Sequence, residues 1–343
     1  MRVIHLITNL DSQGGAQRLV ANLSLYSDQF EPEVHVLDPS DGYLYQKLNS
    51  NGIKVKKISK TSYYLVHLRS KKNKYTILHV HLFPALYYGA LLHGVRKIYT
   101  EHGVTNRRRE IGYLNSTERF IYSRYNKVCA ISEGGKRNLD KWLGGTCNIE
   151  VVPNGIVFEN TKKARDLQTT IFTLGMVARF SESKDQLTLI KLMTVLPKKY
   201  SLVLVGDGSS IQAHKQFARE LDVIDRVTFT GYLDDALFEL RNFDLYIQSS
   251  HYEGFGLAPL EAMAMGIPTI GSNIFGLRET IGRSDAVFEK GDVSSLAKKV
   301  LSIAEDKTYY DELARYGREI SKKFQIENTV KRYESIYCSV LGL

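Results

Sequence analysis

Short apolar segments alternate with amphipathic segments along almost the whole chain of 343 residues, and this alternation limits the fold more than any other feature. Short apolar runs bounded by turn residues are typical of buried strands, whereas an apolar period of about 3.6 residues is typical of helices. Strands separated by about 10 to 15 helical residues form right-handed βαβ units, which build parallel sheets. The sequence therefore predicts an α/β protein.

The alternation runs through the chain twice, which predicts two domains. Strands are predicted in the first half over residues 3–8, 33–38, 53–58, 76–81, 97–102, 127–132 and 149–154. They are predicted in the second half over residues 172–178, 201–206, 226–231, 243–248, 267–272 and 286–290. The polar segment 157–170 lacks periodicity and is predicted to be a linker. We therefore expect two doubly wound domains, over residues 1–158 and 159–324, each with a mostly parallel sheet.

The net charge of +9 is concentrated in the first half of the chain. Residues 1–155 hold 22 lysines and arginines against 12 acidic residues, whereas residues 156–343 hold 24 against 25. The basic stretches 54–60, 69–74 and 106–110 lie near aromatic residues. This combination suits an anionic lipid, a phosphorylated acceptor or nucleic acid, and the plain alternative is a solvated basic face. No nucleic-acid-binding motif accompanies the charge, so we expect no nucleic-acid partner.

Nothing in the sequence indicates membrane insertion or export. No run of about 18 apolar residues is present, so no membrane-spanning helix is expected. The first ten residues are interpreted as a strand and not as a signal peptide. The three cysteines are scattered without metal-ligand spacing, which favours a reducing compartment. A cytoplasmic protein is therefore expected.

The segment HYEGFGLAPLEAMAMGIP, residues 251–268, allows three interpretations. A dinucleotide-binding fingerprint would need a third glycine where Pro259 stands and would follow the first strand of its domain, so a nicotinamide site is disfavoured. An ordinary turn and helix would begin at Pro259 and end at Gly266. On that interpretation Glu261 would only favour the helix dipole, and Glu253 would have no role.

A ligand site accounts for the same segment more fully. Gly254 and Gly256 would let the backbone approach a ligand closely, and the helix N-terminus would offer N–H groups to a diphosphate. Glu261 would accept hydrogen bonds from ribose hydroxyls, and Glu253 would accept them from the hydroxyls of a sugar. Together these groups describe a nucleotide-sugar.

At this point the sequence resembles retaining glycosyltransferases of the GT-B fold, in the family 4 group that builds bacterial surface polysaccharides and glycolipids. The Glu-x7-Glu element matches EGFGLAPLE. Further elements match in order along nearly the whole chain: GGAQR, EHG, VVPNGI, VARFSESKD, VGDG and FTGYLDD. The resemblance implies two Rossmann-like domains facing across a cleft, with a C-terminal helix, residues 325–343, returning to the N-terminal domain.

The resemblance also implies roles for individual residues. Arg179 and Lys184 would hold the donor pyrophosphate and neutralise the leaving group, although the usual Lys-Gly pair is Lys184-Asp185 here. The implied catalytic residues are His102, Arg179, Lys184 and Glu253. The implied donor-binding residues are Gly15, Arg179, Lys184, Gly206, Gly231, Glu253, Gly254, Phe255, Gly256, Leu257 and Glu261. The implied acceptor-binding residues are Gly14, Arg18, His102 and Asn154.

The role of Glu253 stays open between two chemistries. It could act as a nucleophile, as in glycosidases with two carboxylates. The resemblance instead implies that Glu253 binds hydroxyls of the donor sugar, while attack occurs on the same face as departure and the leaving phosphate takes the acceptor proton.

The sequence thus predicts a metal-independent, retaining glycosyltransferase without a cofactor. A hexose would move from a nucleotide diphosphate sugar, with UDP as the first choice and GDP as the second, to a lipid-linked or oligosaccharide acceptor. The basic N-terminal half is expected to dock on an anionic membrane surface through residues 54–74 and 104–125. The alternatives are a nucleotide-sugar epimerase of the same fold, and a basic protein that binds nucleic acid or membranes without catalysis.

Overall fold

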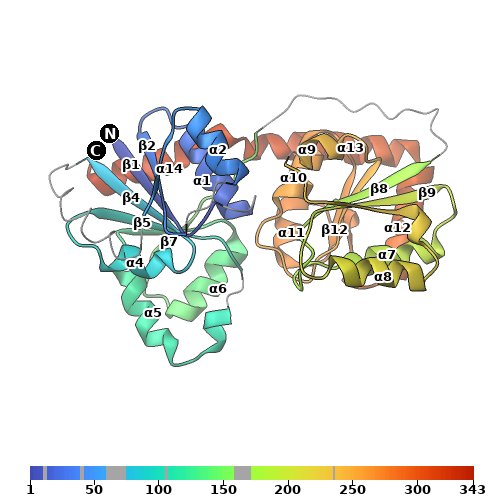
Figure 1. Cartoon of the computed structure of the whole chain (residues 1–343), viewed down its shortest axis with the longest axis horizontal. Coiled ribbons are helices and arrows are strands. Elements are labelled where there is room, and N and C mark those ends of the chain that lie inside the picture. The colour runs from blue at the N-terminus through green and yellow to red at the C-terminus, as the bar shows by residue number, and fades with distance from the viewer. Residues whose placement is uncertain (11–13, 39–41, 59–74, 105–106, 158–170, 235) are drawn as a thin grey trace. The chain divides into compact units, whose positions relative to one another are not determined.

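The computed structural model describes the chain except for residues 11–13, 39–41, 59–74, 105–106, 158–170 and 235. The chain forms two compact units (Figure 1). The first unit consists of Met1–Gly155 together with Phe324–Leu343, and the second consists of Ile156–Lys323.

The first unit is built on a parallel sheet of seven strands in the order β3-β2-β1-β4-β5-β6-β7. The strands are β1 (Arg2–Ile7), β2 (Glu31–Val36), β3 (Lys54–Lys57), β4 (Thr76–His81), β5 (Arg96–Glu101), β6 (Lys127–Ala130) and β7 (Ile149–Val151). The helices are α1 (Gly15–Leu25), α2 (Tyr43–Ser50), α4 (Ala85–Leu91), α5 (Leu114–Ser123), α6 (Glu133–Leu143) and α14 (Ile326–Leu341). The order reverses between β1 and β4, where ligands bind in open α/β sheets.

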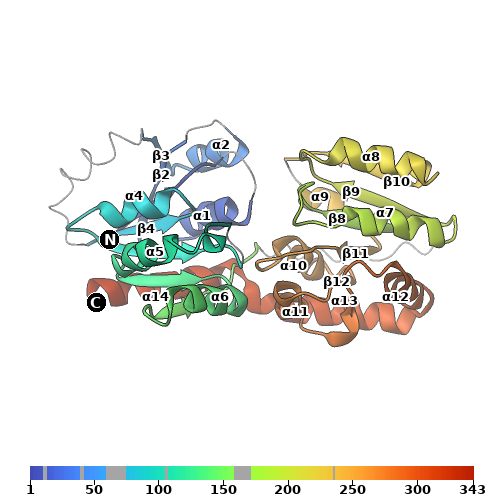
Figure 2. The same cartoon turned by 90° about the horizontal axis from the view of Figure 1, so that it is seen from below.

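The helix α14, red in Figures 1 and 2, covers one face of this sheet. Its side chains Val330, Tyr333 and Tyr337 pack with Val3 of β1 and Ile77 of β4, as alternate residues of a strand face the same way. The opposite face packs against α4, α5 and α6. The end of the chain is therefore part of the core of the first unit.

The second unit has a parallel sheet of six strands in the order β10-β9-β8-β11-β12-β13. The strands are β8 (Phe172–Val177), β9 (Tyr200–Val205), β10 (Val227–Gly231), β11 (Leu245–Gln248), β12 (Thr269–Ser272) and β13 (Val287–Phe288). The helices are α7 (Gln186–Val195), α8 (Ile211–Glu220), α9 (Ala236–Leu240), α10 (Leu257–Ala264), α11 (Phe275–Ile281), α12 (Val293–Glu305) and α13 (Lys307–Ser321).

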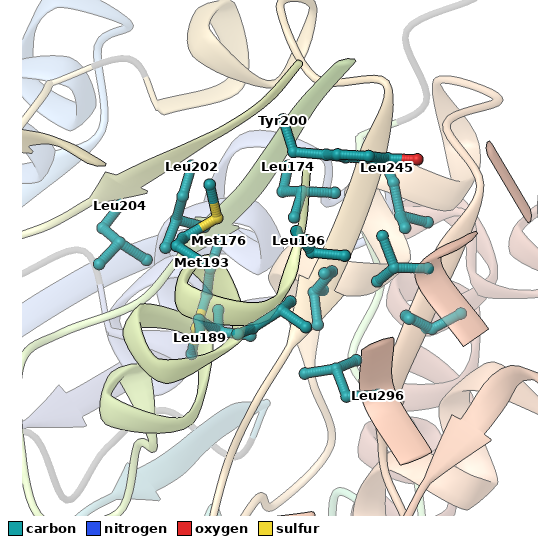
Figure 3. Close-up of a cluster of buried hydrophobic side chains, with 14 of the residues drawn as sticks. Leu174, Met176, Leu189, Met193, Leu196, Tyr200, Leu202, Leu204, Leu245 and Leu296 are labelled. Carbon is teal, nitrogen blue, oxygen red and sulfur yellow. The ribbon is translucent and has the colours of Figure 1, made fainter. Parts of the chain in front are cut away.

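A hydrophobic cluster packs the sheet of the second unit against helices that include α7 and α12 (Figure 3). Leu174 and Met176 of β8 interlock with Leu202 and Leu204 of β9 and with residues of α7 such as Leu189. Burial of each such side chain stabilises the fold by about 1.5–3 kcal/mol before the entropy cost of ordering it. This packing holds the strand ends that carry the site.

The predicted fold class is confirmed, because both sheets are parallel and flanked by helices. Some strands are shorter than predicted. The strand β7 ends at Val151 and not at residue 154, since Pro153 has no N–H to donate to the ladder. Among the described residues no helix is long and apolar enough to cross a membrane.

Candidate active site

Two loops of the second unit meet where the neighbouring strands β8 and β11 end. The backbone N–H of Asp185 donates to the carbonyl oxygen of Ser249 at 3.0 Å, and Lys184 forms a β-bridge with Ser250. These contacts bring the Lys184 ammonium against the Glu253 carboxylate, to which it donates a hydrogen bond. The two side chains are only 17% and 16% exposed. Two of the predicted catalytic residues are therefore an ion pair.

Arg179 lies on the loop after β8, and its side chain is exposed. Its carbonyl oxygen accepts a hydrogen bond from the Gln186 side chain at 3.1 Å, which ties this loop to the first residue of α7. The structure thus places Arg179 and Lys184 on one loop, but it pairs only Lys184 with Glu253.

Gly206 and Gly231 lie at the ends of β9 and β10 and are tied together. The N–H of Gly206 donates to the carbonyl oxygen of Gly231 at 2.9 Å. A Cβ on Gly206 would lie 2.2 Å from the carbonyl oxygen of Ala178. The backbone of the neighbouring loop therefore approaches so closely that only glycine fits at this position. A Cβ on Gly231 would meet no described atom within 4 Å, so only its backbone conformation, with φ +74°, favours glycine.

The helix α10 begins earlier than the sequence predicted. Gly256 is the N-cap with φ +95°, and Leu257 is the first helical residue. Pro259 is therefore the third helical residue and not the first, so the prediction that the helix begins at Pro259 is wrong. The N–H of Leu260 donates to the carbonyl oxygen of Gly256 at 3.4 Å. Because proline has no N–H, the first-turn N–H groups that remain for a ligand belong to Leu257 and Ala258.

The second carboxylate, Glu261, lies one turn into α10 and is 5% exposed. Burial raises the pKa of Tyr246 well above its usual value, and the charges of Glu253 and Glu261 raise it further. The Tyr246 hydroxyl therefore stays neutral, and it donates to the Gln248 side chain at 2.7 Å. Both carboxylates thus act electrostatically on one buried tyrosine.

Three residues that the sequence reasoning missed support the loop that carries Glu253. A Cβ on Gly276 would lie 2.3 Å from the Glu253 carbonyl oxygen, so α11 packs directly on this backbone. The Thr280 hydroxyl donates to the carbonyl oxygen of Phe255, which is itself buried. Neither Gly276 nor Thr280 belongs to a recognisable motif, so the sequence offered no signal for these contacts.

The third of these residues is Asp185, which the sequence reasoning treated only as a departure from the usual glycine. Its carboxylate accepts hydrogen bonds from the backbone N–H of Thr188 at 3.2 Å and from the Thr188 hydroxyl at 2.7 Å. Asp185 is therefore the N-cap of α7. Because Asp185 directly follows Lys184, this cap holds the backbone beside Lys184 in place.

In the first unit, His102 follows β5 and is hydrogen-bonded to another histidine. Its Nε2 lies 3.0 Å from Nδ1 of His81. Burial lowers the pKa of His102 to about 3, so the imidazole is neutral near pH 7. His102 also lines a pocket of about 350 Å³ with Leu82, Phe83, Tyr99, Glu101, Gly103 and Arg108.

Two carboxylates, Glu101 and Glu118, bind the arginine side chains at and beside this pocket. Glu101 accepts hydrogen bonds from Arg109 at 2.7 Å and from the Tyr122 hydroxyl at 2.9 Å. The fully buried Glu118 accepts one from Nε of Arg108 at 2.7 Å. The sequence reasoning treated 106–110 only as a basic stretch, because Glu118 carries no motif.

The arginine Arg108 also forms the aromatic side of the pocket. Its guanidinium carbon lies 4.5 Å from the centre of the Phe83 ring. The pocket therefore combines an aromatic wall with carboxylate, imidazole and guanidinium groups.

The other predicted residues of the first unit lie at the same edge of its sheet. Gly14 is the N-cap of α1 and Gly15 is its first residue. The N–H of Arg18 donates to the carbonyl oxygen of Gly14 at 2.9 Å. The first glycine loop is therefore the start of a helix that follows β1.

Asn154, an implied acceptor-binding residue, lies in a buried turn. It is 2% exposed, and among the described residues its Oδ1 has no hydrogen-bond partner. A Cβ on the neighbouring Gly155 would lie 2.7 Å from Cα of Ile326 in α14. The Asn154–Gly155 turn therefore packs on the C-terminal helix.

Of the basic stretches, 69–74 lies outside the described residues. Lys54–Lys57 form the edge strand β3, and Arg107–Glu110 form a single turn of 3₁₀ helix.

Comparison with known proteins agrees with this geometry. Residues 13–160 match the family model described as Glycosyltransferase Family 4, and residues 157–320 match the model described as Glycosyl transferases group 1. N-acetyl-alpha-D-glucosaminyl L-malate synthase of Bacillus anthracis is 35% identical over 154 residues, which are 44% of this chain and 40% of that protein. The serotype-specific mannosyltransferase WbdA of Escherichia coli is 42% identical over 106 residues, 30% of this chain and 13% of that protein. The chain thus spans less than half the length of either relative.

A solved structure shows the same fold over nearly the whole length. HepE of Anabaena, in complex with UDP and glucose, has a TM-score of 0.86 at 19% identity and covers 99% of this chain and 100% of its own. Because the two family models together span residues 13–320, the chain belongs to the glycosyltransferases of the GT-B fold in the family 4 group.

Proposed function

We propose that the protein is a retaining glycosyltransferase that moves a hexose from a nucleotide diphosphate sugar to a glycan acceptor in bacterial surface polysaccharide synthesis. One observation carries this proposal: the Lys184–Glu253 ion pair lies directly before the glycine-capped start of α10. The cation and the helix N-terminus would bind the negatively charged diphosphate of such a donor. The carboxylate would bind the hydroxyls of its sugar.

The diphosphate would bind between Lys184, Arg179 and the start of α10. The exposed Arg179 side chain is available for a phosphate, and the N–H groups of Leu257 and Ala258 point along the positive end of the helix dipole. An arriving diphosphate would compete with Glu253 for the Lys184 ammonium. Glu253 would then turn to the hydroxyls of the donor sugar.

The buried Glu261 would accept hydrogen bonds from the two ribose hydroxyls. UDP is the proposed nucleotide, since HepE binds UDP and UDP-glucose, and GDP is the second choice. The relatives include a mannosyltransferase, so the hexose itself stays open to the donor screen below.

In the reaction, the bond between the sugar C1 and the diphosphate oxygen breaks and a bond from C1 to the acceptor oxygen forms. The acceptor hydroxyl proton passes to the leaving phosphate oxygen on the same face, which retains the anomeric configuration. Lys184 and Arg179 would stabilise the negative charge that develops on the diphosphate, without a metal ion.

The acceptor is proposed to be a lipid-linked or oligosaccharide glycan that enters the first unit near His102. The surface around α5 supports docking at the cytoplasmic face of the membrane, because Tyr113 and Phe120 are 82% and 60% exposed beside arginines. The Arg124 guanidinium lies 5.9 Å from the Phe120 ring centre. Cosedimentation with anionic and neutral vesicles tests this part, and equal binding to both at low salt would contradict it.

The proposal is tested with UDP, GDP, ADP and dTDP sugars in a thermal-shift panel containing a chelator. One nucleotide family should raise the melting temperature by mass action. The preferred donor is then incubated with a prenyl-diphosphate-linked monosaccharide, and the anomeric configuration of the product is read by NMR. An inverted product, or a need for added metal, would contradict the mechanism, and a split donor with an epimerised sugar would instead identify an epimerase.

A further inference from the structure

Three histidines form a hydrogen-bonded chain that ends at His102; His5 and His81 are buried, and His102 is half-buried. His5 comes from β1, His81 ends β4, and His102 follows β5, and these strands are neighbours in the sheet. Nδ1 of His5 lies 3.3 Å from Nε2 of His81, and Nδ1 of His81 lies 3.0 Å from Nε2 of His102. His5 and His81 are 1% and 0% exposed.

The proton positions along this chain are coupled. A neutral imidazole carries a proton on one nitrogen and accepts with the other. Each of the two hydrogen bonds needs one donor, so the three rings must all carry the proton on Nδ1 or all carry it on Nε2. The chain therefore has two states, and the choice at one end sets the choice at the other.

The two states differ in where they leave a donor without a partner. Among the described residues, the terminal atoms Nε2 of His5 and Nδ1 of His102 have no hydrogen-bond partner. With the protons on Nε2, the unpaired N–H belongs to His5, deep under the sheet. With the protons on Nδ1, it belongs to His102, whose Nδ1 is also covered by neighbouring atoms but whose side chain borders a pocket. A buried donor costs free energy unless it finds an acceptor, and only the His102 end of the chain borders a space that can hold one, so the second state is favoured.

We propose that His5 and His81 are positioning residues that hold His102 in the Nδ1–H form, so that His102 donates a hydrogen bond to a substrate oxygen and does not act as a base. The identity of that oxygen rests on the proposed function, where it is a hydroxyl of the sugar or the acceptor. The tautomer itself does not depend on the reaction.

The electrostatics of the cluster agree with neutral rings. Burial lowers the pKa values of His5 and His102 to about 3 and that of His81 well below its usual value. The neighbouring imidazoles lower the pKa of His81 further. A neutral His102 ring that is fixed as a hydrogen-bond donor is suited to a substrate oxygen that accepts a hydrogen bond throughout the reaction.

A metal ion is the competing explanation for so many histidines. One nitrogen from each of His5, His79 and His81 lies within 4.8 Å of the others. However, both nitrogens of His79 are already engaged, Nδ1 with the Tyr337 hydroxyl at 2.7 Å and Nε2 with the Thr100 hydroxyl at 2.8 Å. A metal would have to break one of these buried bonds, whereas the hydrogen-bonded chain uses the contacts as they stand.

The test is long-range ¹H–¹⁵N NMR of the full-length protein labelled with ¹⁵N-histidine, assigned with a His102→Gln variant. His102 should show the Nδ1–H pattern of couplings. His81→Asn should keep that pattern, since the amide nitrogen of asparagine can replace Nδ1 as a donor. His81→Leu and His5→Leu should move His102 toward the Nε2–H form that free histidine prefers, and lower kcat on the order of tenfold with a smaller change in KM.

Tyr337→Phe is the matched control, because it removes a hydrogen bond from the same buried face without touching the chain. It should lower the melting temperature and leave the His102 tautomer unchanged. An Nε2–H pattern at His102 in the wild type would overturn the proposal, as would stoichiometric metal in the purified protein. If the Nδ1–H pattern is found and no glycosyl transfer is detected, the inference stands and the proposed function fails.

Discussion

The two units share one architecture but fill it with different chemistry. In the second unit, the sheet packs on α7 and α12 through leucine and methionine side chains. In the first unit, the face under α14 carries His5, His79 and His81, with the hydroxyls of Thr100 and Tyr333 hydrogen-bonded at 3.1 Å. A parallel sheet that is covered on both faces does not require polar residues in its interior. The histidines of the first unit therefore stand where apolar side chains would otherwise pack.

The two units also differ in where they place their buried polar groups. In the second unit, the buried hydrogen bonds of Gln248 and Ser250 lie at the carboxyl end of β11, directly under the loop that carries Glu253. In the first unit, the polar groups extend from the strand ends back into the sheet. We therefore expect the first unit to lose more stability than the second when the pH changes.

Acidification should produce the largest difference between the units. The pKa values of His5 and His102 are about 3 in the folded state, against about 6.5 when unfolded. Below pH 6.5 the unfolded chain binds protons that the folded chain does not, so stability is lost as the pH falls from about 6.5 toward about 3. Each group contributes about 1.4 kcal/mol per pH unit, or about 5 kcal/mol for both at pH 4.5.

Hydrogen exchange read separately for the two units between pH 7.5 and 4.5 measures this effect. Protection should fall in β1, β4 and β5 before it falls in β8 and β9. The His5→Leu variant should show a flatter pH dependence in the first unit. Equal loss of protection in both units would contradict the comparison.

Lys184→Ala should have the next largest effect, confined to the second unit. Loss of the cation that faces the leaving diphosphate should lower turnover on the order of 100-fold or more, by analogy with a lost oxyanion donor. Lys198→Ala is the control, because this exposed lysine makes the same charge change before β9, at the opposite end of the strands. Similar turnover in the two variants would remove Lys184 from the mechanism.

Gly276→Ala should disturb the Glu253 loop from below. The added Cβ would lie 2.3 Å from the Glu253 carbonyl oxygen, and overpacking of this kind costs about 1–3 kcal/mol. Nucleotide-sugar affinity, measured by calorimetry, should fall together with the melting temperature. Gly112→Ala in the first unit meets no described atom within 4 Å and should change neither.

The smallest effect should distinguish two helix caps. Asp185→Ala and Ser132→Ala each remove an N-cap, of α7 and α6, and each should cost about 1 kcal/mol. Only Asp185 adjoins Lys184, so only that variant should also slow glycosyl transfer. Chemical denaturation and a transfer assay on both variants would check this, and equal activity would show that the cap serves stability alone.

The alternation of strands and helices was enough to predict both sheets, because burial on two faces leaves long apolar strands that short-range patterns reveal. The contact between Lys184 and Glu253 was partly predictable, since both follow strands of one sheet. That β8 and β11 are neighbours depends on the crossover, which the local sequence does not encode.

The histidine chain was not predictable for the same reason. His5, His81 and His102 are far apart in the sequence, and each alone fits an ordinary buried histidine. Only the strand order β1-β4-β5 brings them together. The start of α10 was missed because Pro259 is a common first helical residue, whereas the cap is set by the left-handed backbone of Gly256.

The place of α14 in the first unit also concerns how the protein is made. On the ribosome, β1 to β7 emerge first, but the helix that covers Val3, Ile77 and the histidines emerges only after the whole of Ile156–Lys323. The second unit is continuous and can close while it is being translated. The N-terminal unit, although begun first, is therefore completed last, which reverses the usual order of domain folding during synthesis.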